Sequence, residues 1–204
     1  ADGSVAPYAI VEAFNPNVAG TPPLAATLFG KENRWGKLPV TMYPRKFIDE
    51  KAMTDYDMSA GVGRTYKYYT GAPLFPFGHG LSYTTFEVAC TTAAAAPPVV
   101  AATIACAVRN TGGRDGDEVV QLYHAVGDAV RKGLDHPAPR RALIDFARVS
   151  VAAGGVANVS FVVEMEALQI VNKTGARHLY PGEHRLYVAR GAGGGDDARF
   201  SVDV

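Results

Sequence analysis

Seven short strand-like segments fill the second part of the chain and constrain its fold more than any other feature. They lie between residues 81 and 204 and are separated by turn residues such as those of Asn110-Thr-Gly-Gly113 and Ala153-Gly-Gly155. The segments are Tyr83–Cys90, Val99–Arg109, Glu118–Ala125, Ala142–Val151, Val156–Glu164, His184–Ala189 and Ala198–Val204. Short strands at this spacing are typical of an immunoglobulin-like or fibronectin-like β-sandwich. The sequence therefore predicts a mainly β fold.

Alternation along these segments indicates which side chains face the core. Val159, Phe161 and Val163 fall on one face of their strand, so Asn158 and Ser160 fall on the other. We expect the apolar face to lie inside the sandwich and the polar face to meet solvent.

Two tripeptides, Asn158-Val-Ser160 and Asn172-Lys-Thr174, fit the acceptor pattern for N-linked glycosylation. Asn158 faces outward by alternation, and Asn172 falls in a predicted loop. We expect glycans on both asparagines if the protein is secreted. Such tripeptides also arise by chance in proteins that are never glycosylated.

The chain has two cysteines, Cys90 and Cys106, which are too few for a metal site built from thiolates or for a disulfide-rich miniprotein. Each shares the parity of its apolar neighbours and is predicted to be buried. We expect two free thiols packed as small hydrophobic groups. The alternative is a disulfide between neighbouring strands, which requires an oxidising compartment.

The first eighty residues show a mixed α/β pattern. Tyr8–Phe14 is a nearly continuous apolar run, which predicts a strand buried on both faces of a parallel sheet. A short helix is predicted next, with Thr21 as N-cap, Pro22 at its first position and Gly30 at its end. Lys37–Met42 predicts a second strand.

A long loop is predicted over Tyr43–Thr70, where no period is sustained. One helix and two strands cannot enclose a core, because a parallel strand needs neighbours on both edges and helices on both faces. We therefore divide the chain into residues 1–80, the last part of a larger α/β domain, and residues 81–204, the sandwich. The alternative is a small private domain closed by the loop. We expect residues 1–80 to expose apolar surface when alone.

Several motifs follow one another with a recognisable spacing. They are Leu28–Gly30, Trp35–Thr41, Gly63–Tyr66, Phe77–Tyr83, Val108–Gly112, Gly116–Tyr123, Pro181–Glu183 and Phe200–Val204. Together they resemble the C-terminal region of glycoside hydrolase family 3, the β-glucosidases and β-xylosidases. The resemblance covers essentially the whole chain and implies a fibronectin type III-like domain after the tail of an α/β domain. The Tyr-rich sequence after Gly63 is closer to the xylosidases.

The resemblance also implies what this chain lacks. In the family, the nucleophile is an aspartate of an N-terminal barrel, and the acid/base glutamate is expected upstream of Ala1. Retaining hydrolysis needs both carboxyl groups about 5 to 5.5 Å apart. We therefore expect no catalytic residue in this chain and no activity from it alone. Its expected partner is the barrel and α/β part of the same precursor, or another chain that covers residues 1–80, with a β-linked glycan as substrate.

Four carboxylates are available as catalytic groups: Glu12, Glu50, Asp55 and Asp57. We expect them to be solvated charges in loops rather than a catalytic pair of carboxyl groups. Asp55 and Asp57 lie just before the Gly63–Tyr66 motif.

Arg64, Tyr66 and Tyr69 are candidates to line a sugar subsite, because guanidinium and phenol groups can hydrogen-bond or stack on a sugar. Tyrosines in such loops more often serve in packing, and this is the alternative.

Charge and motif content exclude several classes of function. The formal net charge is zero with a pI near 7.2, which excludes binding of nucleic acid through a basic face. No apolar run is long enough for a membrane span, and residues 1–10 do not form a signal peptide. The five histidines share no metal-ligand spacing, and we expect no metal or cofactor. The stretch 191–197 is interpreted as a flexible hairpin turn.

The leading hypothesis is the C-terminal portion of a family 3 glycosidase that braces the catalytic domains. The protein is expected to be secreted or in the cell wall, with its signal peptide upstream of this chain. The alternative is a non-catalytic structural subunit derived from the family. The sequence departs from the family's helix-opening Gly-Gly pair, since residues 15–23 read NPNVAGTPP, and this is compatible with a homologue that has lost activity. A free-standing carbohydrate-binding sandwich is disfavoured, because no strand carries an exposed aromatic row.

Overall fold

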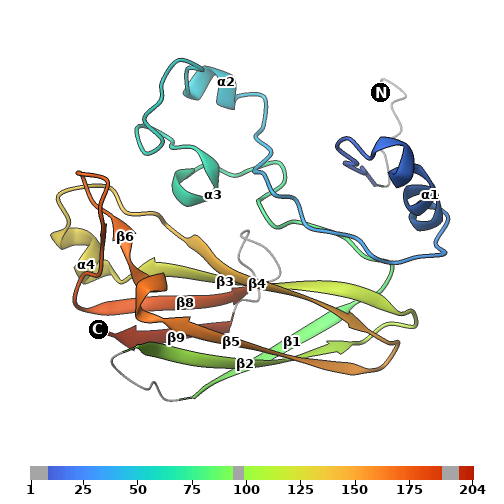
Figure 1. The fold of residues 1–204 in the computed structure, drawn as a ribbon. Coiled ribbons are helices and arrows are strands. Elements are labelled where there is room, and N and C mark those ends of the chain that lie inside the picture. Colours follow the sequence, from blue (N-terminus) through green and yellow to red (C-terminus); the bar gives the residue numbers. More distant parts are fainter. Residues whose placement is uncertain (1–8, 94–98, 190–197) are drawn as a thin grey trace.

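The computed structural model describes residues 9–93, 99–189 and 198–204. Tyr8, residues 94–98 and the turn predicted at 191–197 lie outside the described residues. In the described part, residues 9–85, here called the N-terminal segment, cross one face of a two-sheet β-sandwich (Figure 1).

The sandwich has a three-stranded and a four-stranded antiparallel sheet. The three-stranded sheet has the order β1-β2-β5, formed by β1 (Phe86–Ala93), β2 (Val100–Asn110) and β5 (Val156–Glu164). The four-stranded sheet has the order β4-β3-β8-β9, formed by β4 (Ala142–Val151), β3 (Gly116–Val126), β8 (Glu183–Ala189) and β9 (Ala198–Asp203). Each of the seven strands predicted over residues 81–204 has a counterpart, so the mainly β fold is confirmed.

Short elements absent from the sequence prediction complete the second part. They are α4 (Asp128–Gly133), the 3-10 helix η1 (Met165–Leu168), and a hairpin of β6 (Ile170–Val171) and β7 (Arg177–His178). The two-residue strands are too short to show a period of two, which explains why the pattern did not reveal them.

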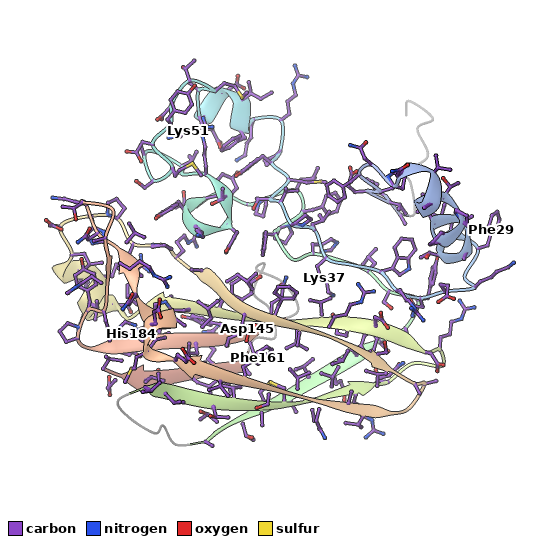
Figure 2. All side chains as sticks on the ribbon, in the orientation of Figure 1. Phe29, Lys37, Lys51, Asp145, Phe161 and His184 are labelled. Carbon is purple, nitrogen blue, oxygen red and sulfur yellow. A yellow bond between two sulfur atoms is a disulfide. The ribbon has the colours of Figure 1, made fainter. Side chains whose placement is uncertain are left out.

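The core lies between the two sheets. Its largest side chains include Phe161, which Figure 2 shows inside the sandwich, and Ile104, Leu122, Leu168 and Leu186. Along β5 the buried and exposed residues alternate as predicted, with Val159, Phe161 and Val163 inside and the polar side chains of that strand outside.

Strand β3 departs from alternation, because every residue except Asp117 is buried. One face of an antiparallel sheet packs on the core, while the other usually meets water. Here the N-terminal segment covers that second face, as the contact of Tyr66 with Tyr123 of β3 illustrates. The segment is therefore part of what buries β3.

The N-terminal segment itself has little regular structure. It contains α1 (Asn17–Leu28), α2 (Phe47–Glu50) and α3 (Thr65–Tyr68). The predicted strand at Tyr8–Phe14 is wrong over the described residues 9–14, which have no strand and carry exposed Ile10 and Phe14. No neighbouring strand lies in the described chain to pair with it, and an unpaired strand has no hydrogen-bonding partner.

The second predicted strand, Lys37–Met42, is also wrong. Only an isolated bridge from Met42 to Phe75 forms there. Helix α1 begins at Asn17 rather than after Thr21, so Pro22 and Pro23 lie inside it. Each proline removes one backbone donor from the helix. Its end is as predicted, since Gly30 adopts a φ of 71° that terminates the helix.

Candidate functional site

A buried ion pair joins the N-terminal segment to the sandwich. Lys37 Nζ lies 2.7 Å from Glu118 Oε1, and the two side chains are 13% and 4% exposed. Figure 2 shows Lys37 between the segment and the strands below it. Glu118 Oε1 also accepts a hydrogen bond from the Val119 backbone N–H at 2.8 Å. The pair ties the Trp35–Thr41 motif to the Gly116–Tyr123 motif.

Asn33 makes a second connection with its side chain and backbone. Its Nδ2 donates to the Asp115 carbonyl at 3.0 Å, and its carbonyl accepts from Asp117 N–H at 3.1 Å. Its Oδ1 accepts from Ser82 Oγ and from Tyr83 N–H at 3.0 and 3.1 Å. One asparagine thus connects the turn after α1, the start of β3 and the approach to β1.

Arg148 of β4 extends this connection. Its guanidinium donates to the Arg34 carbonyl at 2.7 Å and pairs with Asp117 at 2.8 Å. Ser150 Oγ donates to the same carboxylate at 2.6 Å. Burial raises the pKa of Asp117, but the hydrogen bonds from Ser150 and Arg148 outweigh it and hold the pKa below its ordinary value.

The long loop over residues 43–70, here called the 43–70 loop, is attached near the start of β4. Arg140 donates from its backbone N–H to the Lys67 carbonyl at 2.7 Å and from its guanidinium to the Tyr69 carbonyl at 2.6 Å. Tyr66 Oη accepts the Leu143 backbone N–H at 3.0 Å. The α3 turn is therefore bound to the sandwich from both ends.

The three predicted subsite residues differ in their surroundings. Tyr66 stacks on Phe77 at 4.2 Å between ring centroids. Tyr69 is buried, with its ring edge-on to Tyr43 and Phe47. Arg64 donates to the Ala52 carbonyl. The two tyrosine rings are thus engaged in packing within the 43–70 loop and against the sandwich.

Two buried polar atoms of this turn have no hydrogen-bond partner among the described residues, Tyr69 Oη and Arg64 Nε. Between them Thr65 holds a φ of 58°, a left-handed value that is unusual for a β-branched residue. Its N–H donates to Tyr43 Oη at 2.6 Å. The surrounding contacts hold the backbone in this conformation.

A buried lysine organises the first part of the 43–70 loop. Lys51 Nζ donates to Asp55 Oδ2 at 2.5 Å, to the Asp57 carbonyl at 2.7 Å and to the Ala60 carbonyl at 3.0 Å. The hydrogen bond from Lys51 lowers the pKa of Asp55, and hydrogen bonds from Ser59 lower that of Asp57. These carboxylates stabilise the loop as ionised groups.

The carboxylates of Glu12 and Glu50 also have partners close by in the chain. Glu12 accepts from Phe14 N–H at 2.8 Å, and Glu50 pairs with Lys46 at 3.4 Å. None of the four is arranged with another as a pair around a shared pocket in the described structure. A polar hollow of about 490 Å³ lies elsewhere, beside Asn33 and Asp117, and contains none of them.

The outer side of the N-terminal segment carries large apolar side chains in water. Tyr56, Phe29 and Met53 are 87%, 85% and 84% exposed. Others are Ile10, Phe14, Val18, Ile48 and Leu74. In Figure 2, Phe29 points away from the sandwich. The expectation of exposed apolar surface in this part is confirmed for the described residues. Soluble domains seldom leave so many large apolar groups uncovered.

Cys90 and Cys106 form a disulfide rather than two free thiols. They are directly opposite each other on β1 and β2, with Cα atoms 4.1 Å apart. The sequence placed both on one face but could not align the two strands, so the expectation of free thiols was wrong. Disulfides persist in oxidising compartments.

Two histidines form a buried pair that the sequence did not predict. His124 Nε2 lies 2.8 Å from His184 Nδ1, and His184 Nε2 lies 2.8 Å from the Tyr180 carbonyl. A carbonyl only accepts, so His184 Nε2 carries the proton, and its Nδ1 accepts from His124. Within the described ranges no cluster of histidine, cysteine and carboxylate residues could hold a metal ion.

Comparison with known families and structures accounts for both parts of the chain. Residues 4–83 match the glycosyl hydrolase family 3 C-terminal domain, and residues 118–192 match the fibronectin type III-like domain. The chain belongs to glycoside hydrolase family 3. It comprises the C-terminal region of a β-xylosidase- or β-glucosidase-like protein of that family.

Relatives of this family 3 chain come from bacteria, fungi and plants. The xylan 1,4-β-xylosidase of Xylanibacter ruminicola is 36% identical over 179 residues, which are 87% of this chain and 20% of the relative. The exo-1,4-β-xylosidase of Emericella nidulans is 36% identical over 197 residues, which cover 88% of this chain and 25% of the relative. The chain spans a fifth to a quarter of the length of these relatives.

Solved family 3 enzymes contain the same fold. The Bifidobacterium adolescentis β-glucosidase superposes with a TM-score of 0.74 at 28% identity, covering 91% of this chain and 28% of that one. A family 3 exo-β-xylosidase bound to a xylobiose aziridine probe superposes with a TM-score of 0.74 at 25% identity. The match covers 91% of this chain and 26% of that one. No helix of the described residues is long and apolar enough to cross a bilayer.

Proposed function

We propose that this chain is the C-terminal region of an exo-acting β-xylosidase, which releases xylose from β-linked xylosides. The observation that carries the proposal is the 36% identity to two xylosidases over almost nine-tenths of the chain. The Arabidopsis thaliana β-D-xylosidase, 30% identical over 88% of the chain, adds support.

The catalytic carboxyl groups then belong to the part of the enzyme that precedes this chain. Retaining hydrolysis needs a nucleophile and an acid/base group close together. Glu12, Glu50, Asp55 and Asp57 are occupied in local contacts instead. This supports a role in which residues 1–80 and 81–204, as two structural units, brace the catalytic domains.

The bracing acts through the 43–70 loop. Contacts from Arg140 and Leu143 fix its α3 turn on the sandwich, while Lys51 fixes its other half. Its exposed Met53 and Tyr56 then face the preceding domains, which bury them in the whole enzyme. Arg64, Tyr66 and Tyr69 act by holding the loop toward a sugar subsite.

We further propose that the enzyme is secreted and carries N-linked glycans. The disulfide between Cys90 and Cys106 supports passage through an oxidising compartment. The two acceptor tripeptides at Asn158 and Asn172 support glycosylation there.

Steady-state kinetics of the full-length enzyme test the proposal. We expect kcat/KM for a p-nitrophenyl β-xyloside to exceed that for the β-glucoside by about 10-fold or more, since a xylose pocket must reject the extra hydroxymethyl group. A preference for the glucoside would replace xylosidase by glucosidase. Absence of hydrolysis of both would favour a structural member of the family.

A further inference from the structure

We propose that Asn158 carries a glycan that lies across the outer face of the three-stranded sheet and keeps that face from associating with others. The inference rests on the proposed secretion of the enzyme. It concerns a surface remote in the fold from the 43–70 loop.

The outer face of this sheet is made of small side chains. Strand register places Asn158 opposite Ala107, which lies opposite Ala89. The next rows are Ser160, Ala105 and Thr91, followed by Val162, Thr103 and Ala93. Charge is carried at the two ends of this face, by Arg109 and Glu87 in the row of Val156 and by Glu164 opposite Val100. Asn158, Ser160 and Val162 are exposed, as are Ala89, Thr91, Ala93 and Ala105.

The three rows between these charged ends consist mainly of alanine, threonine and valine, together with Asn158 and Ser160. Because these rows carry no long charged side chain, another sheet can stack on them. A bulky hydrophilic group attached to this face would prevent such stacking.

Asn158 is the residue placed to carry such a group. It lies on β5, which is an edge strand, and its side chain is exposed with no hydrogen bond to any described residue. Its row neighbours, Ala107 and Ala89, have no side-chain atoms beyond Cβ. Sugar rings attached at Asn158 therefore meet a smooth surface on which their C–H groups can pack, without a clash.

Asn172 provides an internal comparison, because its side chain is already engaged. Its Oδ1 accepts from Thr174 N–H, Thr174 Oγ1 and Ala176 N–H at 2.9, 2.8 and 3.0 Å, which holds the turn between β6 and β7. It projects from a hairpin tip and covers no such face. A glycan there would leave the three-stranded sheet unprotected.

Site occupancy is measured first, on the full-length enzyme secreted by a eukaryotic host. Trypsin alone leaves both asparagines in the peptide of residues 149–173, so a second cleavage after Glu164 and Glu166 is needed to separate them. After enzymatic glycan release, the asparagine that carried a glycan becomes aspartate. We expect conversion of Asn158 at near-full occupancy. An unmodified Asn158 in secreted enzyme overturns the proposal.

Function of the glycan is tested with matched variants. Asn158→Gln and Ser160→Ala both abolish the acceptor pattern, whereas Ser160→Thr keeps it, and Asn172→Asp removes the other site while retaining its acceptor oxygen. We expect the first two to self-associate in size-exclusion chromatography and to bind more hydrophobic dye. Ser160→Thr and Asn172→Asp should behave as the wild type.

Monomeric, dye-free Asn158→Gln and Ser160→Ala enzymes would overturn the covering role. Hydrolysis of the aryl β-xyloside by the same samples separates the two proposals. An inactive wild type with a glycosylated Asn158 contradicts the proposed function alone, and an active enzyme with unmodified Asn158 contradicts this inference alone.

Discussion

Lys37 and Glu118 form a buried ion pair, with 2.7 Å between Nζ and Oε1, across the junction of the N-terminal segment and the sandwich. The two residues come from two different family motifs, which are 81 positions apart in the chain. A buried pair of this kind is costly to break on one side, because the remaining charge is left without compensation.

The first prediction concerns this pair. Lys37→Met should lower the stability of the enzyme by about 3–5 kcal/mol, since Glu118 stays buried and unpaired. The double variant with Glu118→Leu should recover much of that loss. Thermal and denaturant unfolding measure both. The control is Lys173→Met, which removes the exposed pair with Asp135 and should cost about 1 kcal/mol or less. Equal losses for Lys37 and Lys173 would show that the junction does not depend on the pair.

The second prediction concerns pH. Burial, the neighbouring His184 and Arg131 lower the pKa of His124 to about 3. Between pH 6.5 and about 3 the unfolded chain therefore binds a proton that the folded chain does not. The stability that neutral His124 contributes is present above pH 6.5 and is lost as the pH falls, at up to about 1.4 kcal/mol per pH unit.

The window from pH 6.5 to 4.5 separates this effect from that of carboxylates with lowered pKa values such as Asp117, which act below about pH 4. Unfolding in denaturant across the window should show the slope in the wild type. His124→Gln, which still donates to His184, should flatten it. A slope that is the same in both proteins would assign the pH dependence to other groups.

The third prediction concerns the 43–70 loop. Lys51→Met removes three hydrogen bonds from a buried ammonium and should raise amide exchange over residues 52–60, while β2 and β3 keep their protection. The catalytic efficiency of the full-length enzyme should also fall, because the 43–70 loop is no longer held in place. Lys46→Met is the matched control, because Lys46 is 65% exposed in its pair with Glu50. Unchanged exchange after Lys51→Met would show that the loop is held by other contacts.

The fourth prediction concerns the disulfide. Cys90 and Cys106 are 16 residues apart. A cross-link closing a loop of about this length stabilises a protein by about 3 kcal/mol. The free energy of unfolding of the double variant Cys90→Ala, Cys106→Ala should be lower than that of the wild type by this amount, measured by denaturant unfolding. A mild reductant should not lower the stability of the double variant further. A double variant as stable as the wild type would mean that the cross-link does not contribute to the free energy of unfolding.

The sandwich could be predicted from the sequence because its strands have their partners in the same chain. The bounds of β4 and β5 coincide with the predicted segments, since alternation and the turn at Gly154 and Gly155 mark both. The direct opposition of Cys90 and Cys106 depends on strand register, which alternation alone does not give.

The N-terminal segment could not be predicted in the same way. Apolar residues such as Ile10 and Phe14 suggested a buried strand, but nothing in the described chain lies beside them. Lys37 gave no local signal of its buried position, because its partner Glu118 is distant in sequence. Local sequence patterns indicate periodicity and turns. The missing strand and the burial of Lys37 depend instead on which parts of the fold, distant in sequence, pack against these residues.

We propose that the rest of the full-length enzyme covers the outer side of the N-terminal segment. Hydroxyl-radical footprinting of the full-length enzyme measures this directly at Met53 and Tyr56, which are 84% and 87% exposed here. We predict that both react far more slowly in the folded enzyme than in the urea-unfolded enzyme. If they react as fast folded as unfolded, the surface is free and the bracing role is wrong.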